Sequence, residues 1–93
     1  LEDTWKWLLN QKDYAAFRAV TPVLGVWDDH DFGKDDADGT LKYKKESQKQ
    51  FLDFLEEPKD SERRIREGIY TSHVFGEGQR KIKFILLDNR YFR

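Results

Sequence analysis

Apolar side chains recur every three or four residues through the first twenty positions of the chain. This spacing places them along one side of a helix and predicts helical structure from about Asp3 to Val20. The helix should stop at Thr21-Pro22, because the residue before a proline is driven out of the α region. Three large aromatic residues in this segment have the spacing of core positions, so no ligand is needed to explain them: Trp5, Trp7 and Phe17.

A short apolar run comes next, and the helical period then returns. Val23 to Trp27 is brief and follows a proline, which favours a buried strand over a helix. A helix is predicted from about Thr40 to Leu55, with Thr40 as its N-cap. A further short helix is predicted from Ser61 to Glu67, with Ser61 as its N-cap.

The last third of the chain has the pattern of a β-hairpin. Two β-rich runs, Ile69 to Phe75 and Lys81 to Leu87, flank a turn that contains two glycines. The second run becomes apolar on both faces toward its end, which suits an inner strand covered on both sides. The predicted order of helix, strand, loop, helix and two strands indicates a mixed α/β fold with layered helices and strands.

Composition narrows the class of protein. The 93 residues include 17 Lys and Arg, 18 Asp and Glu and no Cys, with a net charge of −1. The chain therefore cannot form disulfides or a thiolate zinc site. Near-neutral charge argues against nucleic acid or anionic lipid as a partner, and the apolar runs are too short to span a membrane. The low apolar content, a first residue other than Met and the absence of a closing element after the last strand predict that residues 1–93 form a single partial domain.

An acidic loop follows the predicted strand and gives the strongest chemical signal. Six Asp and one His lie between Asp28 and Gly39. Ligand sites of α/β sheets commonly form at the carboxyl ends of strands, and carboxylates with imidazole suit divalent metals. A bound cation would remove the repulsion among these carboxylates. The alternative is a solvated turn at Asp38-Gly39. A calcium EF-hand is excluded, because its first and last ligand positions would be Lys34 and Lys45.

One block around the acidic loop reads Gly25-Val26-Trp27-Asp28-Asp29-His30-Asp31-Phe32-Gly33, followed by Asp36-Ala37-Asp38. Further characteristic residues follow in order at Lys45, Ser47, Phe51-Leu52-Asp53-Phe54-Leu55, Arg63-Arg64, Gly68-Ile69-Tyr70, Phe75-Gly76 and Leu86-Leu87-Asp88-Asn89-Arg90-Tyr91-Phe92-Arg93. With these residues the sequence, from about Val20 to its C-terminus, resembles the alkaline phosphatase D (PhoD-like) family of calcineurin-like metallophosphoesterases. The resemblance implies a central fragment of a metallophosphoesterase-type β-sandwich flanked by helices.

The same resemblance implies a role for each residue of the acidic block. Asp29 would be a metal ligand, and Asp28 a second ligand or a hydrogen-bond partner. His30 would bind a phosphate oxygen or protonate the leaving alkoxide, and Asp31 would hold the His30 ring. The implied reaction is hydrolysis of phosphate mono- or diesters at a binuclear site of Fe, Ca, Mn or Zn. The family's upstream Asp and downstream His motifs have no counterpart here, so this site would be incomplete in the 93 residues.

Two departures from the family pattern lie in the same loop. Phe32 stands where the family often has Tyr, and Asp35-Asp36-Ala37 stands where it often has Asn-Asp-Ala. Both could change loop packing or metal preference. A different class of function stays open: a non-catalytic α/β domain that binds a metal or a partner through the acidic 28–38 loop.

The remaining charged residues have structural explanations. His73 is expected on the surface or between strands of the hairpin. Solvated helix charges explain the three Arg residues between Arg63 and Arg66 better than phosphate steering does. Asp88 and Arg90 are expected to form a structural Asp–Arg pair at the sheet edge.

Overall fold

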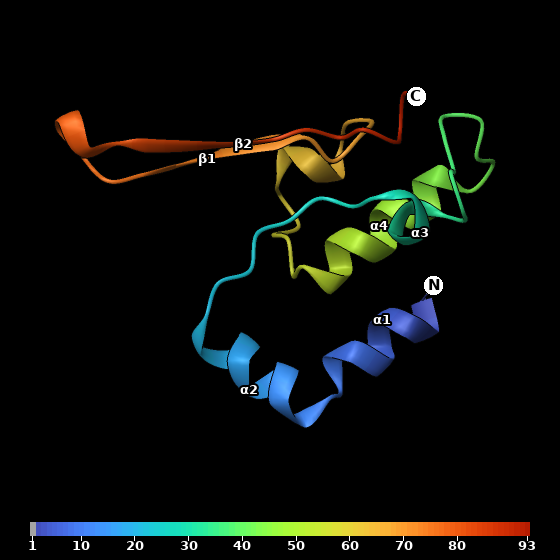
Figure 1. The fold of residues 1–93 in the computed structure, drawn as a ribbon, viewed down its shortest axis with the longest axis horizontal. Coiled ribbons are helices and arrows are strands. Elements are labelled where there is room, and N and C mark those ends of the chain that lie inside the picture. Colours follow the sequence, from blue (N-terminus) through green and yellow to red (C-terminus); the bar gives the residue numbers. More distant parts are fainter. Residues whose placement is uncertain (1) are drawn as a thin grey trace.

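A computed structural model describes residues 2–93, and it places a β-hairpin beside a group of helices (Figure 1). The two strands pair antiparallel and make up a two-stranded sheet. This confirms the coarse mixed α/β class. None of the helices in residues 2–93 combines the length and the apolar character needed to cross a membrane. The elements in order are α1 Glu2–Leu9, α2 Lys12–Val20, α3 Asp29–Phe32, α4 Lys44–Phe54, η1 Glu62–Arg64, β1 Thr71–Phe75, η2 Gly78–Arg80 and β2 Ile82–Leu86.

The first predicted helix is two helices with a break between them. Gln11 adopts an extended backbone with ψ 127°, which ends α1 and begins α2 in a new direction. Trp5 still packs against the core, with its ring centroid 4.5 Å from that of Phe54. The core prediction is wrong for Trp7 and Phe17, which are 63% and 51% exposed. Trp5 and Trp7 lie two positions apart in α1, about 200° around the helix, so Trp7 points away from the core when Trp5 packs on it. Phe17 lies in α2, beyond the break.

The predicted strand from Val23 to Trp27 is absent, since this segment has no regular structure. A strand needs a hydrogen-bonded neighbour, and β1 and β2 pair with each other in the part of the chain that the structure describes. Side chains fix the segment instead. The Trp27 ring is buried, and the Gly25 carbonyl accepts a hydrogen bond of 2.9 Å from Arg63 Nη2.

The long central helix begins four residues later than predicted. Asp38 Oδ1 accepts hydrogen bonds from both the hydroxyl (2.6 Å) and the backbone amide (2.9 Å) of Thr40. This local turn makes Thr40 a loop residue and not a helix cap. Tyr43 occupies the N-cap position of α4, without a capping side-chain bond.

One face of α4 supplies much of the hydrophobic core. Phe51 and Leu52 are buried there, and the Phe51 ring lies 5.4 Å from that of Trp27. The same face carries Gln48, whose Nε2 donates to the carbonyls of Arg63, Arg66 and Gly68. The buried hydrophobic residues are Trp27, Phe32, Ala37, Leu41, Phe51, Leu52, Phe54, Leu55, Ile69 and Tyr91.

The segment after α4 contains the predicted Ser61 cap, which accepts a hydrogen bond from the Arg63 amide. The helix is a single 3-10 turn, shorter than predicted. The prediction of a solvated Arg63 is wrong, because its residue exposure is 2%. Its Nη1 lies 3.3 Å from Glu57 Oε2, so the buried charge is paired. Burial lowers the pKa of Arg63, and the neighbouring Glu57 carboxylate works in the opposite direction.

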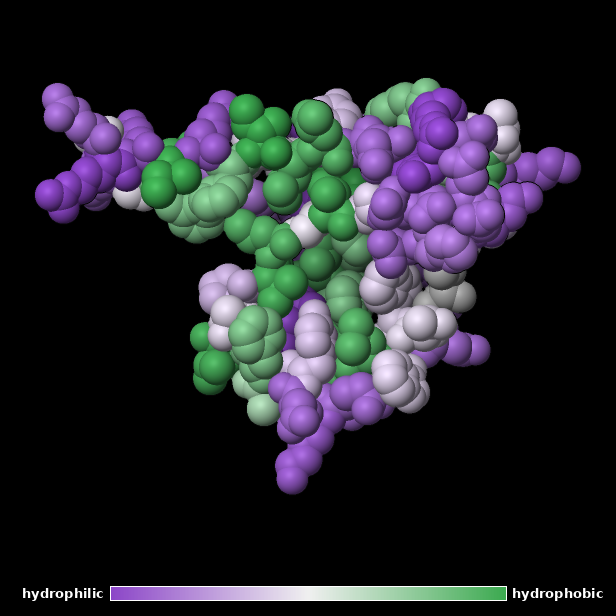
Figure 2. Space-filling view, viewed as in Figure 1, coloured by the Kyte–Doolittle hydropathy of each residue, from purple (hydrophilic) through white to green (hydrophobic). Residues whose placement is uncertain are grey.

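The hairpin is confirmed, with His73 opposite Phe84 and Phe75 opposite Ile82. The prediction that its second strand is covered on both faces is wrong, since Ile82, Phe84 and Ile85 are all exposed. Within residues 2–93 the hairpin extends away from the helices, and no second layer packs on the exposed side chains of β2 (Figure 1). Apolar side chains gather along it and toward the centre of the molecule, while hydrophilic ones cover the opposite side (Figure 2).

Candidate metal centre

The acidic block begins where the irregular segment enters the single turn of α3. Phe32 at the end of this turn is fully buried between the rings of Trp27 and Tyr91, at centroid distances of 4.8 and 6.3 Å. At its start, Asp31 Oδ2 accepts a hydrogen bond of 3.0 Å from the Asp28 amide. The buried Phe32 ring and the Asp31 cap together fix α3, so that its polar side chains lie at the protein surface.

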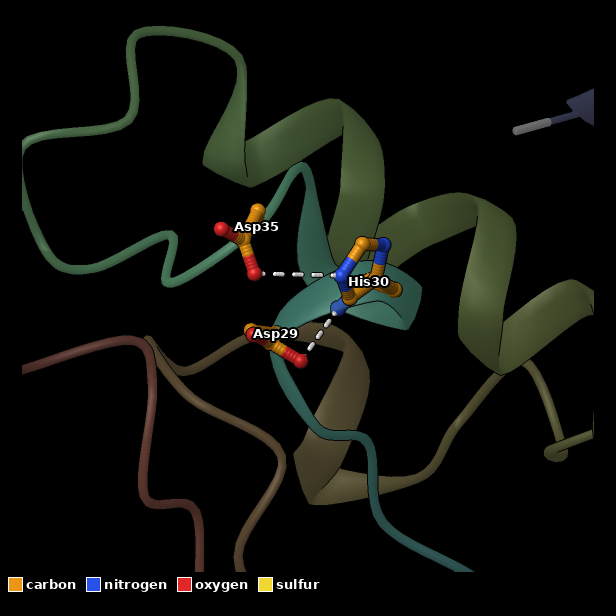
Figure 3. A group of neighbouring side chains, drawn as sticks. All are labelled: Asp29, His30 and Asp35. Atoms are coloured by element: carbon orange, nitrogen blue, oxygen red, sulfur yellow. Dashed lines mark hydrogen bonds and ion pairs between the residues drawn. The ribbon is translucent and has the colours of Figure 1, made fainter.

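Three potential metal ligands come together at this turn. Asp29, His30 and Asp35 each offer a ligand atom, and these atoms lie within 4.8 Å of one another. His30 Nε2 lies 3.4 Å from Asp35 Oδ1, and both side chains are open to solvent (Figure 3). Asp29 is less exposed than either of them. Asp29 and His30 were predicted as site residues, and the structure places them together.

Backbone amides orient the Asp29 carboxylate. Its Oδ2 accepts a hydrogen bond of 2.8 Å from the Asp36 amide, and its Oδ1 accepts one of 2.9 Å from the His30 amide. The bond from Asp36 lowers the pKa of Asp29 most strongly. Desolvation opposes this effect, and the His30 amide adds to it. Asp29 is therefore ionised at neutral pH, as a metal ligand must be.

The other two predicted site residues have different partners. Asp28 Oδ1 lies 2.8 Å from both Nε and Nη2 of Arg90, so Asp28 serves as a hydrogen-bond partner and not as a member of the cluster. Asp31 caps α3 through its carboxylate. The carboxylate beside the His30 ring belongs to Asp35, where the resemblance implied Asp31.

The donor set fits one divalent ion. Two carboxylates and an imidazole are ligands that Mn²⁺, Zn²⁺ and Fe²⁺ accept, and their exposure leaves room for water or substrate. Within residues 2–93 these three residues form a single cluster, which does not supply the ligands of a second ion.

Sequence reasoning missed the basic residues that contact this loop. Arg90 Nη1 and Arg93 Nη1 lie 3.2 and 2.7 Å from Asp36 Oδ1. The predicted Asp88–Arg90 pair is wrong in its partners, because the Arg90 side chain contacts Asp28 and Asp36 instead. Asp88 is structural as expected, but it accepts N–H groups from Trp27, Ile69, Arg90 and Tyr91.

The remaining basic candidates are also paired within the fold. Arg64 bonds Asp53 Oδ1 at 2.6 Å and the Glu57 carbonyl at 2.6 Å. Arg66 bonds the Tyr70 carbonyl and stacks on its ring. These contacts favour structural roles for Arg64 and Arg66. His73, by contrast, lies in β1 opposite Phe84, and its Nε2 is buried without a hydrogen-bond partner among the described residues.

Comparisons of the chain with family models, curated proteins and solved structures found no match. The resemblance to PhoD-like phosphoesterases therefore stays a prediction that rests on the residues quoted above.

Proposed function

We propose that these residues form part of the active site of a metal-dependent phosphoesterase that hydrolyses phosphate mono- or diesters. The observation that carries the proposal is the convergence of Asp29, His30 and Asp35 on a volume that one divalent ion could occupy. The ordered PhoD-like motif supports the same reading. A β-sandwich around this segment, with ligands for a second ion, belongs to the proposal.

The chain's own residues have distinct tasks in this scheme. Asp29 is oriented by two backbone amides and presents a fixed anionic ligand. In this scheme Asp29 and Asp35 would hold the ion, and the exposed His30 imidazole would stay off the metal with its Nε2 beside Asp35. The imidazole would then hydrogen-bond a phosphate oxygen or give a proton to the leaving oxygen. A bound divalent ion would offset phosphate charge and lower the pKa of a water.

Two measurements test the proposal. Calorimetric titration of the 93-residue chain with Mn²⁺ should show one site, and Asp29→Asn or His30→Ala should weaken binding by about tenfold or more. The exposed residue Asp60, changed to Asn, is the matched control and should leave the affinity unchanged. In the product of the complete reading frame, His30→Ala should lower hydrolysis of bis(p-nitrophenyl) phosphate by about a hundredfold or more. Unchanged hydrolysis would overturn the mechanism.

A second candidate is a non-catalytic domain that binds one metal ion through the same loop. The observation in its favour is that residues 2–93 supply three donors, enough for one ion and not for a pair. Tight Mn²⁺ binding combined with no phosphodiester turnover by the product of the complete reading frame would favour this candidate over the phosphoesterase.

A further inference from the structure

Arg90 joins the end of the chain to both sides of the acidic loop. Its Nε lies 2.8 Å from Asp28 Oδ1, and its Nη1 lies 3.2 Å from Asp36 Oδ1 and 3.5 Å from the Ala37 carbonyl. The Arg90 side chain is largely buried, with 12% of it exposed. A planar guanidinium has several donors in fixed directions, so one Arg can contact two carboxylates at once.

The contact with Asp36 fixes a backbone conformation that is otherwise disfavoured. Asp36 has φ 54°, in the left-handed region that non-glycine residues seldom adopt. Its carboxylate is bound by both Arg90 and Arg93. Its amide donates the 2.8 Å hydrogen bond to Asp29 Oδ2. Asp36 thus links Arg90 to the carboxylate of Asp29, the candidate metal ligand.

Arg90 also divides the carboxylates of the loop into two groups. Asp28 and Asp36 are bound by its guanidinium, whereas Asp29 and Asp35 lie with His30 in the metal-ligand cluster. Without a cation among them, four carboxylates at this density would repel one another. The pairing leaves Asp29 and Asp35 as the carboxylates available to a divalent ion.

We infer that Arg90 is a positioning residue for the Asp29–His30–Asp35 cluster, because it fixes Asp36 so that the Asp36 amide orients the Asp29 carboxylate. This inference rests on the metal site of the proposed function. It makes a prediction opposite in sign to that of a simple charge effect. Removing the positive charge of Arg90 lessens its Coulomb repulsion of Mn²⁺ and should by itself strengthen Mn²⁺ binding. Loss of positioning should weaken the binding.

The experiment compares Arg90→Gln and Arg90→Lys with the wild-type chain by Mn²⁺ calorimetry. Arg90→Gln should weaken binding about tenfold, the lower range for loss of a residue that orients a metal ligand. Arg90→Lys keeps the charge but cannot bond both carboxylates in the same fixed geometry, so its affinity should be intermediate. The matched control is Arg80→Gln, the same change at an exposed position in η2, and it should bind as the wild type does. Unchanged or tighter binding by Arg90→Gln would overturn the inference.

A second readout separates this inference from the proposed function. NMR should show slow hydrogen exchange of the Asp36 amide in the metal-free wild-type chain and faster exchange in Arg90→Gln. If the wild type binds no Mn²⁺, the proposed function fails, while the exchange rate still tests whether Arg90 fixes Asp36. Equal exchange in the two proteins would overturn the inference. Asp36→Asn removes the carboxylate contact without altering the core. If the Arg90 variants do not fold, the amide exchange and Mn²⁺ affinity of this variant test the inference in their place.

Discussion

Trp27 and Asp88 are joined across the fold by a hydrogen bond of 2.9 Å from the indole Nε1 to the carboxylate Oδ1. The same oxygen accepts the amides of Arg90 and Tyr91 at 3.0 Å, and Oδ2 accepts the amide of Ile69 at 2.9 Å. Asp88 therefore connects the segment before the acidic loop, the start of the hairpin and the end of the chain.

Replacing Asp88 by Ala should destabilise the chain by about 3 kcal/mol, because the buried N–H groups of Trp27 and Ile69 would lose their acceptor. Asp88→Asn keeps one acceptor oxygen, so we expect a loss of only about 1 kcal/mol. Urea unfolding followed by Trp fluorescence gives both values. The exposed Asp60, changed to Ala, should alter stability by less than about 0.5 kcal/mol. Equal effects at Asp88 and Asp60 would contradict the role of Asp88.

The buried Arg63 depends on Glu57 for its charge partner. Glu57→Ala should reduce the free energy of unfolding by about 3 kcal/mol, because it leaves a buried guanidinium charge unpaired. The double variant Glu57→Leu/Arg63→Met should recover part of this loss, since it removes both charges. Chemical denaturation of the single and double variants measures the coupling.

The exposed Arg66–Glu62 pair provides the control for this measurement. Arg66 Nη1 lies 3.5 Å from Glu62 Oε2, and the Glu62 side chain is 85% exposed. Glu62→Ala should therefore change the unfolding free energy by less than about 1 kcal/mol. A loss as large as that of Glu57→Ala would contradict the assignment of a buried pair.

The Asp38 turn should contribute to stability in a pH-dependent way. The Thr40 hydroxyl, together with the Thr40 amide, lowers the pKa of Asp38 below its ordinary value of 3.8. A lowered folded-state pKa means that the contribution is complete well above pH 3.8 and is lost as the pH falls through the lower folded value. The difference in Tm between the wild type and Asp38→Asn should therefore be largest near pH 6 and shrink below pH 4. A difference that stays constant from pH 6 to pH 3 would exclude the carboxylate as its source.

Gly39 lies where the acidic loop approaches the end of the chain. A Cβ at this position would lie 2.9 Å from the Tyr91 carbonyl oxygen and 3.0 Å from that of Arg93, and backbone cannot yield as a flexible side chain does. Gly39→Ala should cost roughly 1–3 kcal/mol of unfolding free energy. Gly25→Ala meets only Leu55 at 3.9 Å and should not destabilise the chain. Thermal unfolding of the two variants should separate them clearly.

The parts of the fold that could be predicted from the sequence depend on local patterns. The hairpin followed from two β-rich runs, and the Ser61 cap followed from its position before a short helix. The Asp29–His30 pair could be foreseen because the two residues are adjacent. Asp35 lies five residues beyond His30, so a turn of unknown geometry decides whether they meet.

The parts that could not be predicted depend on contacts between distant segments. Arg90 meets Asp36 and Asp28 across 54 and 62 residues, a relationship that no periodicity encodes. The burial of Arg63 depends on the Gly25 carbonyl, 38 residues away. The hydrophobic pattern also predicted a β2 strand buried on both faces. It cannot show whether another layer packs on a strand, and Ile85 is exposed in the structure.

The extended hairpin has a consequence for how the molecule opens. Exposed residues such as Ile82 and Ile85 contribute little burial energy to the hairpin, so its cross-strand hydrogen bonds should open locally at low free energy. The amides of α4 should exchange only when the core itself opens. Because Asp88 is bonded to Trp27 at the base of the hairpin, such fluctuations should end before they reach Arg90. The molecule would then combine a fluctuating ribbon with an acidic loop that keeps its geometry.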